Sequence, residues 1–481
     1  MNTPSPAAPD FTGSQPAGGT KSGLRIGEIQ GTITAEGGRA WLYPRETAGR
    51  FTRARRALAW VLMAVYLGVP WIHWRGEPLF EIDWFGRKLM LLGHYFWPKD
   101  IPIFLPGIFA LLIIAIGTTA RLGRLWCGWA CPQTVFLQFL FGPIERLIEG
   151  KAAVRKRRDS SPSGMDWIGR KAIKHGVFLA ISWWIANTAL AYFWGMDNLV
   201  WAIRHPAAGN FTGLALVAAF TAVFYYIFAY FKEQACIMLC PYARLQSVLL
   251  DESTSLIAYD EKRGEPRGKG PKGTREGLGD CTDCRQCVLV CPTGIDIRQG
   301  NQLECIGCAR CIDACDMTMT AWKKPIGLVR YASLRELQGK PAGGGNGRLY
   351  AYGGLAFLMA AVCLALLSRR PAISADLVRR GQSPYEKVAA DSVRNVYTLF
   401  LRNNGSRRRV IRIGWQGTAA GSTNWDGREF ALAGGAAASL PVDIMVPASA
   451  FTRGRKDAVL ALQGEGLDQS IPLGLAGPWG R

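Results

Sequence analysis

The chain has 481 residues, of which 49% are hydrophobic and 19% are charged. This composition excludes a disordered, collagen-like or small disulfide-rich protein and favours membrane helices. The 57 lysines and arginines against 36 acidic residues give a net charge of +21, which is compatible with nucleic acid, acidic lipid or positively charged membrane loops.

The first 40 residues are polar and rich in Gly, Pro, Ser and Thr. Because no apolar stretch follows a basic start there, a signal peptide is not expected. We predict a disordered N-terminal tail over 1–40.

Five apolar runs follow, each close to the ~20 residues that a helix needs to cross a bilayer. A buried core helix is the alternative for any single run, but five runs with basic flanks predict a polytopic α-helical membrane protein with about five spans. We expect a four-span membrane domain over 41–260 and a fifth span within 336–370. The runs are Ala57–Trp74, Ile101–Ala120, Val177–Trp194, Gly213–Phe231 and Leu349–Leu367.

The distribution of Lys and Arg between the loops predicts the orientation, because cytoplasmic loops carry the excess. The loop 121–175 has 11 such residues, whereas 75–102 has 4 and 195–212 has 1. The N-terminus and the segment 232–348 are therefore expected in the cytoplasm, and the segment after residue 368 on the other side. This placement accounts for much of the positive charge, so membrane lipid is the expected partner and nucleic acid is not.

Two C-x3-C-P motifs follow the second and the fourth apolar run. The first contains Cys127 and Cys131, and the second contains Cys236 and Cys240. Each comes after an outward-to-inward crossing, so both are expected at the cytoplasmic end of the membrane. Four soft thiolates in a partly dry site suit Cu(I), zinc or an iron–sulfur cluster. A redox-active disulfide and a structural role are the alternatives, and Cys363, which has no partner in the sequence, is expected to be structural.

The cysteines between residues 281 and 315 form the most specific motif of the chain. Two C-x2-C-x2-C-x3-C runs follow one another. This pattern is typical of bacterial two-cluster ferredoxins, in which each [4Fe-4S] cluster takes three thiolates from one run and the fourth from the other. A structural zinc site is the alternative, but zinc ligands usually come as separate C-x2-C pairs. The predicted ligands are Cys281, Cys284, Cys287 and Cys315 for one cluster and Cys305, Cys308, Cys311 and Cys291 for the other.

We therefore predict a cytoplasmic ferredoxin-like α+β domain over 261–335, with 264–279 as a flexible, Gly- and Lys-rich tether. Asp316 follows the second run, where the first run is followed by Pro292. We expect its negative charge to lower the potential of the nearby cluster. Since no Rossmann, P-loop or flavin motif is found, the electron donor must be another molecule.

The segment 371–481 changes character. Short segments such as 395–402 and 409–415 are rich in β-branched or aromatic residues, and Asn403, Asn404 and Gly405 lie between them. This alternation of strands and turns predicts an all-β immunoglobulin-like sandwich. The segment has no cysteine, so no disulfide is expected there.

Several longer stretches carry a resemblance to a known family. LYPRE, GRFTRARR, HYFWPKD, CGWACPQTVF, EQACIMLCPYARLQSVLLD, IAYDEKRGEPRG, CPTGIDIRQG and KPIGLVRYASL occur in this order over about 42–335. With these stretches the chain resembles the FixG/CcoG (RdxA-like) family of membrane polyferredoxins, which are cytochrome c oxidase accessory proteins. The C-terminal NVYTLFLRN resembles the family's immunoglobulin-like domain more loosely.

The resemblance implies a cupric reductase of the bacterial inner membrane, with a periplasmic C-terminal domain. Such a protein passes electrons through two [4Fe-4S] clusters to Cu(II) and supplies Cu(I) for assembly of the cbb-type haem-copper oxidase. The eight cluster ligands carry over, and Cys127, Cys131, Cys236 and Cys240 become the candidate catalytic and copper-binding residues. The family commonly has an acidic residue where this chain has Gln138.

The resemblance also implies partners and alternatives. Oxidase subunits, a copper chaperone or a copper transporter are the expected partners, the electron donor stays unknown, and a homodimer is compatible with the sequence. The C-x3-C-P element is also similar to that of NapH- and NosR-type proteins. A quinol-linked electron-transfer subunit is therefore the alternative function, and a non-redox assembly scaffold is another.

Overall fold

The computed structural model describes most of the chain beyond residue 38. The tail predicted to be disordered, 1–40, lies almost wholly outside the described residues. The described ranges are 39–84, 86–162, 164–205, 211–269, 276–340, 346–381, 383–389, 391–416, 421–451, 454–464 and 467–479.

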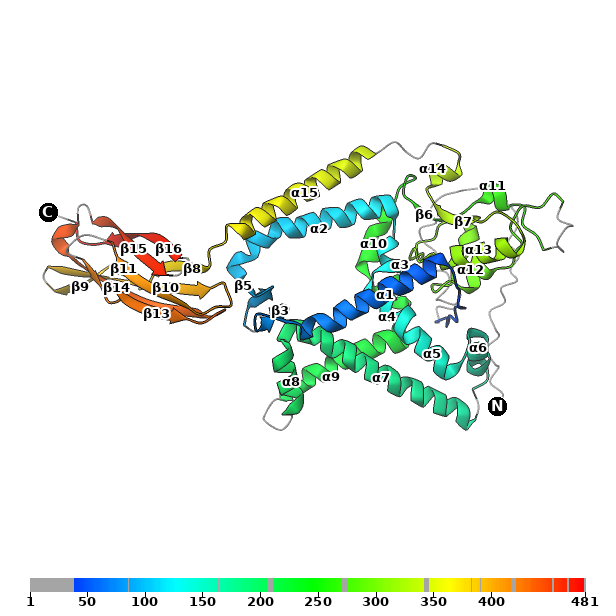
Figure 1. The fold of residues 1–481 in the computed structure, drawn as a ribbon, viewed down its shortest axis with the longest axis horizontal. Helices are drawn as coiled ribbons and strands as arrows, with labels where there is room; N and C mark the ends of the chain where they lie inside the picture. The colour runs from blue at the N-terminus through cyan, green and yellow to red at the C-terminus, as the bar shows by residue number, and fades with distance from the viewer. Residues whose placement is uncertain are drawn as a thin grey trace.

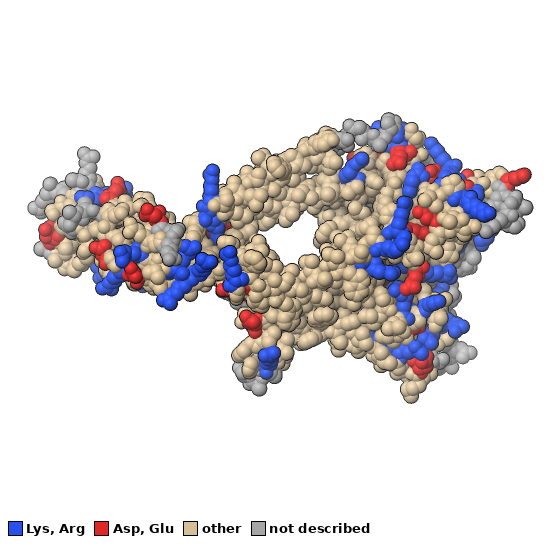
Figure 2. Space-filling model, in the orientation of Figure 1, with Lys and Arg blue, Asp and Glu red and all other residues tan. Residues whose placement is uncertain are grey.

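The molecule is elongated, and three regions follow one another along its longest axis (Figure 1). A cysteine-rich α+β region lies at one end, long helices form the middle, and an all-β domain lies at the other end. These are the parts that the sequence predicts. In Figure 2, charged side chains gather at the two ends, while the middle is almost free of them. An uncharged belt of this kind matches the apolar interior of a membrane.

Four helices in the described part of the chain are long and apolar enough to cross a membrane. The shortest has 20 residues, which at ~1.5 Å per residue spans the hydrocarbon core. Only 6% of the apolar window of this helix is buried inside the protein, so its surface needs an apolar surrounding. The four are η2–α2 (Pro98–Leu122), α7 (Met165–Trp194), α9–η4 (Phe211–Phe231) and, within α15 (Asn346–Ser368), the segment Leu349–Ser368.

The first predicted span, Ala57–Trp74, is displaced in the structure. Helix α1 covers Arg50–Gly68, and the chain then passes through the 3-10 helix η1 (Val69–Trp71) into strand β1 (His73–Trp74). Pro70 lies in this exit and cannot donate the backbone hydrogen bond that would continue the helix. The apolar part of α1 is therefore shorter than the predicted run. Helix α1 is not among the four apolar helices, and the number of five spans stays a prediction.

A small group of strands fills the segment 75–102, for which the sequence predicts only a loop. This group contacts the β-domain, since Tyr95 donates its backbone N–H to the Asn404 carbonyl at 2.9 Å. Arg370, at the start of the β-domain, also pairs with Asp100. Both contacts hold the β-domain at the end of the helices that lies away from the cysteine-rich region. The strands are β2 (Glu77–Pro78), which pairs with β1, and the sheet β3 (Phe80–Asp83), β4 (Lys88–Leu91) and β5 (His94–Phe96).

Helices α2 and α15 lie side by side (Figure 1). Glycines permit this approach, because a Cβ at Gly107 would lie 3.0 Å from the Sγ of Cys363 and one at Gly117 would lie 3.4 Å from Tyr352. Cys363 is thus a buried packing residue, in agreement with its predicted structural role. Figure 2 shows an opening between this helix pair and the other helices.

The C-terminal domain consists of two antiparallel sheets around one core, as predicted. Side chains alternate between core and surface along the strands, and Leu399, Leu401, Ile411 and Ile413 are fully buried. One sheet contains β8 (Ile373–Arg379), β9 (Glu386–Ala389), β10 (Ser392–Asn403), β12 (Ser422–Thr423) and β14 (Ala437–Pro447); the other contains β11 (Arg409–Trp415), β13 (Arg428–Leu432), β15 (Arg455–Gly464) and β16 (Leu467–Ala476).

The cysteine-rich region is a small α+β unit. Strands β6 (Leu256–Tyr259) and β7 (Val329–Ala332) form an antiparallel pair that brings the two ends of the region together. Its core combines aliphatic residues of these strands with the cysteines themselves. The helices are α11 (Glu261–Gly264), α12 (Gln286–Leu289), η6 (Ile297–Gln299), α13 (Arg310–Ala321) and α14 (Leu334–Leu337).

The predicted tether, 264–279, is only partly a linker. Residues 270–275 lie outside the described residues. The flanking residues are held against the α+β unit, since Gly279 donates to the Pro266 carbonyl at 2.9 Å and Cys281 to that of Gly264 at 3.4 Å. The prediction is therefore wrong for the described flanks, because backbone hydrogen bonds outweigh the flexibility that their composition suggests.

Candidate metal centre

The two cysteine runs adopt the same local structure. Arg285 (φ 55°) precedes α12 and Ala309 (φ 58°) precedes α13, and both are in the left-handed conformation. A left-handed residue turns the chain sharply. The first two cysteines of each run therefore lie in a loop, and the third, Cys287 or Cys311, lies in the first turn of the following helix.

The structure brings the predicted ligand sets together. Burial is the main cause of the raised pKa of Cys315. The next largest cause is the charge of Cys284, in the first run, so these two cysteines lie close together. In the same way Cys308, in the second run, raises the pKa of Cys291. Each run thus places its fourth cysteine beside the other run, which is the exchange that the predicted ligand sets require.

A small cavity tests whether these residues fit an iron–sulfur cluster. Its wall contains the complete second set, Cys291, Cys305, Cys308 and Cys311, together with isoleucines such as Ile306. Thiolate sulfur is the usual ligand of such clusters, and the apolar wall limits access of water. Burial also raises the pKa of Cys305 to about 12, so binding of a cluster there must displace thiol protons.

Buried donors without partners support the same fit. Arg55 Nη1 and Arg124 Nε are buried and have no hydrogen-bond partner among the described residues. Arg55 interacts electrostatically with Cys308, and Arg124 with Cys305. A cluster bound by four thiolates would place sulfur acceptors beside these cations. The donor set and its surroundings are therefore compatible with a [4Fe-4S] cluster.

One cysteine of the first ligand set reaches solvent, although Cys281 and Cys287 of that set are buried. Cys284 is exposed, whereas Cys308 in the second set is buried. Asp316 is adjacent to Cys315. Its charge is the third cause of the raised pKa of Cys315, smaller than burial and the charge of Cys284. Its Oδ1 accepts the backbone N–H of Gly327 at 2.9 Å, which holds the carboxylate in place. The expected acidic group is therefore next to this set, and its effect on the potential stays a prediction.

The two C-x3-C-P motifs differ in the backbone at the first cysteine and agree at the second cysteine and the proline. Cys127 lies in α3 (Leu125–Trp129), and Cys236 lies in the single π-helical turn η5 (Ala235–Leu239). The second cysteines, Cys131 (ψ 126°) and Cys240 (ψ 111°), are extended, and the proline after each begins a new helix. These helices are α4 (Pro132–Phe136) and α10 (Pro241–Val248).

The four thiols of these motifs lie within one another's electrostatic influence. Burial raises the pKa of Cys236 to about 12, and Cys131, Cys127 and Cys240 contribute to the shift. Cys127 Sγ also lies 3.2 Å from the Oε1 of Gln246, which is fully buried. Among the described residues, no three or more His, Cys, Asp or Glu side chains are grouped tightly enough to hold a single metal ion.

The first motif contacts the cluster-binding region directly. A Cβ added at Gly128 would lie 2.6 Å from the Ile306 carbonyl oxygen and 2.8 Å from the Cys308 backbone. On the other side of the contact, a Cβ at Gly307 (φ +69°) would lie 3.0 Å from the Arg124 carbonyl oxygen. Only glycines permit this backbone approach. It brings the first C-x3-C-P motif, at Gly128, to the loop that carries Cys308.

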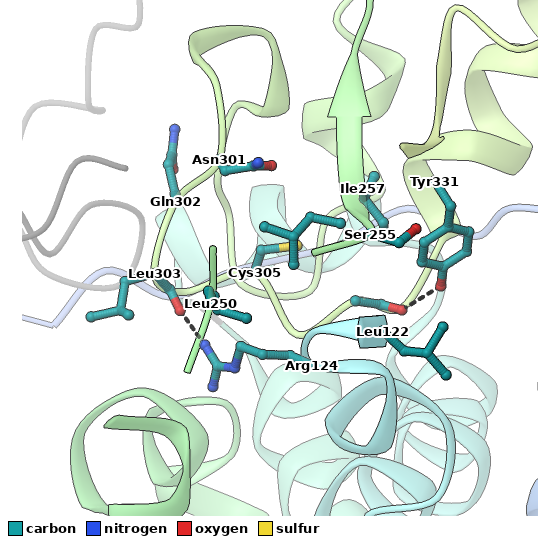
Figure 3. Close-up of a pocket in the computed structure, with 12 residues that line it drawn as sticks. Leu122, Arg124, Leu250, Ser255, Ile257, Asn301, Gln302, Leu303, Cys305 and Tyr331 are labelled. Carbon is teal, nitrogen blue, oxygen red and sulfur yellow. Dashed lines mark hydrogen bonds between the residues drawn. The ribbon is translucent and has the colours of Figure 1, made fainter. Parts of the chain in front are cut away.

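Polar contacts strengthen this junction (Figure 3). The Tyr331 hydroxyl donates to the Gly307 carbonyl at 2.8 Å and accepts the Trp129 Nε1–H at 3.3 Å. Figure 3 also shows Arg124 beside the loop that carries Cys305, with its guanidinium directed at a carbonyl of that loop. The membrane helices and the cluster-binding loop therefore meet through several specific contacts.

The sequence did not single out Arg55, Gly128, Arg124 or Tyr331 as site residues. Only Arg55 carried a signal in the sequence. It lies just before an apolar run, and a charged side chain there loses contact with water when the run is buried. The glycine after Cys127 has no counterpart in the second motif, where Ile237 follows Cys236. The sequence shows this difference, but its consequence depends on the loop of Ile306 and Cys308, which Gly128 contacts in the structure.

Comparison with protein families supports an iron–sulfur protein. A 4Fe-4S dicluster domain matches residues 231–334, and a 4Fe-4S binding domain matches residues 104–151. The IG-like fold at the C-terminus of FixG matches residues 363–472. The predicted iron–sulfur cofactors and the immunoglobulin-like type of the β-domain are thereby confirmed. The chain is an iron–sulfur, oxidoreductase-like protein of electron transfer.

Individual relatives extend the similarity over most of the chain. Protein RdxA of Cereibacter sphaeroides is 35% identical over 79% of this chain and 82% of its own length. The nitrogen fixation protein FixG of Rhizobium meliloti is 37% identical over 61% of this chain and 57% of its own length. A crystal structure of a FixG-related protein from Vibrio parahaemolyticus matches 22% of this chain and 98% of that chain, with 15% identity and a TM-score of 0.20. The identity to RdxA over most of both chains shows that this chain belongs to the FixG/RdxA family.

Proposed function

We propose that the protein accepts single electrons at its cysteine-rich region and delivers them to Cu(II) at the four C-x3-C-P cysteines. One-electron transfer is the chemistry that two [4Fe-4S] clusters supply when they are bound. Each Cu(II) would gain one electron and become Cu(I), and the electron would be supplied by a reduced cluster held by the cysteine-rich region. The observation that supports this proposal is the direct contact between Gly128 and the Cys308 backbone.

The exposure of the cysteines suggests the direction of electron flow. Cys284 is exposed, so a soluble donor would meet the first ligand set. In the second set Cys308 is buried and its backbone lies against the first C-x3-C-P motif, so this set would be the last carrier before copper. The residues proposed to hold the clusters are Cys281, Cys284, Cys287 and Cys315 for the first and Cys305, Cys308, Cys311 and Cys291 for the second.

The chemistry of the four membrane-side thiols suits the product. Thiolate is a soft ligand and prefers Cu(I) over hard cations. Burial raises the pKa of Cys127 and Cys236, so copper binding must release thiol protons. Met238, between Cys236 and Cys240, is 43% exposed.

For the topology, we propose five crossings of a bacterial inner membrane. Helix α1 begins beside the cysteine-rich region and ends at the strands that contact the β-domain, so it runs in the same direction as a crossing (Figure 1). The loop 121–175 carries 11 Lys and Arg residues, which favours the cytoplasm for the cysteine-rich end. The β-domain would then lie in the periplasm, where it could bind an oxidase subunit or a copper carrier.

The test is Cu(II) reduction by the purified, chemically reduced protein. We expect the double variants Cys127→Ser/Cys131→Ser and Cys236→Ser/Cys240→Ser to keep their iron and to lose most of the reduction rate. Cys363→Ser is the matched control, because this buried cysteine packs against Gly107, away from both motifs. If both double variants with full iron content reduce Cu(II) as fast as the wild type, the copper site is elsewhere.

A further inference from the structure

Arg55 is a fully buried cation where helix α1, the first C-x3-C-P motif and the loop of Cys308 meet. It lies in α1, and its side chain has an exposed fraction of 0%. Its Nε donates to the Gly128 carbonyl at 2.8 Å, and its Nη2 donates to the Gln138 Oε1 at 2.7 Å. Its third nitrogen, Nη1, is buried without a hydrogen-bond partner among the described residues.

No carboxylate neutralises Arg55 within ion-pair distance in the described part of the chain. Asp313 is the closest in effect, but its carboxylate accepts hydrogen bonds from Phe51 and Thr52 instead. A charge that is buried without an opposite charge destabilises the folded protein, because it loses its hydration. Negative charge that arrives with a bound group would offset this cost. The electrostatic partner of Arg55 with the largest effect is Cys308.

We propose that Arg55 donates its free Nη1–H to a sulfur of the cluster held by the second ligand set and thereby raises the potential of that cluster. Reduction adds one negative charge to a cluster, so a cation fixed beside it stabilises the reduced form. The cations Arg124 and Arg310 also lie near this set, together with two buried carboxylates, Glu304 next to Cys305 and Asp313 two residues after Cys311. The first set has Asp316 beside Cys315, with Arg50 3.9 Å from that carboxylate, and Arg298 acts on Cys287.

The same guanidinium also sets the position of the electron acceptor. Its hydrogen bond to the Gly128 carbonyl holds the first C-x3-C-P motif against the loop of Cys308. Arg55 is therefore a positioning residue that couples the potential of the cluster to its contact with the membrane-side cysteines. With Asp316 beside one set and Arg55 beside the other, electrons would collect at the cluster that touches the first motif.

The inference rests on the two-cluster part of the proposed function and not on copper. The test is an anaerobic redox titration of the full-length protein, followed by EPR. In Arg55→Gln we expect one of the two cluster transitions to move to lower potential. The reduced-to-oxidised ratio of that cluster at a fixed potential should fall at least tenfold, which is ~59 mV for a one-electron couple. Arg55→Lys should restore most of this shift, because it keeps the charge.

Two further variants separate the charge of Arg55 from its role in folding. Gln138→Glu keeps Arg55 in place and puts a carboxylate at its Nη2, so we expect the same transition to move downwards. Arg56→Gln removes an equal charge from the exposed side of the same helix and should leave both transitions unchanged.

The result that overturns the proposal is an unchanged potential in both Arg55→Gln and Gln138→Glu, or an equal shift of both clusters. If Arg55→Gln loses iron, Gln138→Glu alone decides between these outcomes. A shift without any Cu(II) reduction in the wild type would support Arg55 and refute the copper proposal.

Discussion

The two C-x3-C-P motifs show how one repeated pattern acquires two roles. Both place an extended second cysteine before a proline that begins a helix. The first motif has Gly128 after its first cysteine and contacts the cluster-binding loop, whereas the second has Ile237 at the same position. The repeat thus supplies two equivalent pairs of thiols. This difference of one side chain lies at the position where the first motif contacts the loop of Cys308.

Copying the second motif into the first should give the largest loss of activity. Gly128→Ile would place a branched side chain where even a Cβ lies 2.6 Å from the Ile306 carbonyl oxygen. The backbone contact must open, and a displacement of ~1 Å can cost about 10²-fold in rate. We expect Cu(II) reduction to fall by about that factor while iron is retained. Ile237→Gly is the matched control and should change the rate little; equal losses in the two variants would contradict the asymmetry.

Loss of the buried ion pairs around Glu145, which join the segments of the two motifs, should have the largest effect on stability. Glu145, downstream of the first motif, pairs at 2.7 Å with Lys232, four residues before Cys236. Although burial opposes it, the charges of Lys232, Arg155 and Lys174 lower the pKa of Glu145 to about 2. Glu145→Gln would leave these buried cations uncompensated and should lower the free energy of unfolding by about 3–5 kcal/mol.

The pH dependence of this effect has a defined sign. A carboxylate with a lowered pKa stabilises the folded protein at pH values above its ordinary pKa, and this stabilisation is lost as the pH falls towards about 2. The unfolding temperature of the wild type should therefore decrease over that acid range, and that of Glu145→Gln should lack this part of the decrease. Glu429→Gln, which removes an exposed ion pair with Arg412, is the control and should have almost no effect.

A smaller effect is expected where the second motif supports the first. Gln246, in the helix after Cys240, faces Cys127 Sγ at 3.2 Å and donates to Thr119 Oγ1 at 3.4 Å. Gln246→Leu copies Leu137, the residue five positions after the proline of the first motif. The loss of both contacts should cost about 1–3 kcal/mol, because buried polar groups lose their partner. Thermal unfolding measures it, and an unchanged midpoint would show that Gln246 does not support Cys127.

Tyr331→Phe should give the smallest effect. It removes a hydroxyl that bonds Gly307 and Trp129 but keeps the ring in place. A neutral hydrogen bond contributes about 1 kcal/mol, so we expect a small loss of stability and less than a tenfold decrease in the Cu(II) reduction rate. A larger decrease than that of Gly128→Ile would mean that the hydroxyl, and not the backbone contact, joins the two regions.

Local patterns explain what could be predicted. The spacing of the eight cluster cysteines, the prolines after Cys131 and Cys240, and the alternation of apolar residues in the β-domain act within one loop, turn or strand. Long apolar runs likewise indicate membrane helices wherever they occur. The end of α1 at Gly68 and the strands within 75–102 were missed, because they depend on Pro70 and on contacts with residues such as Asn404.

Residue types and their spacing along the chain were enough to predict the candidate cluster ligands, the repeated thiol pairs and the order of membrane, iron–sulfur and β regions. Only the tertiary structure decided that Arg55 is buried, that Gly128 meets the Cys308 loop and that Glu145 reaches Lys232. These contacts join segments far apart in the chain. Their energies come from desolvation and close packing, which no local pattern records.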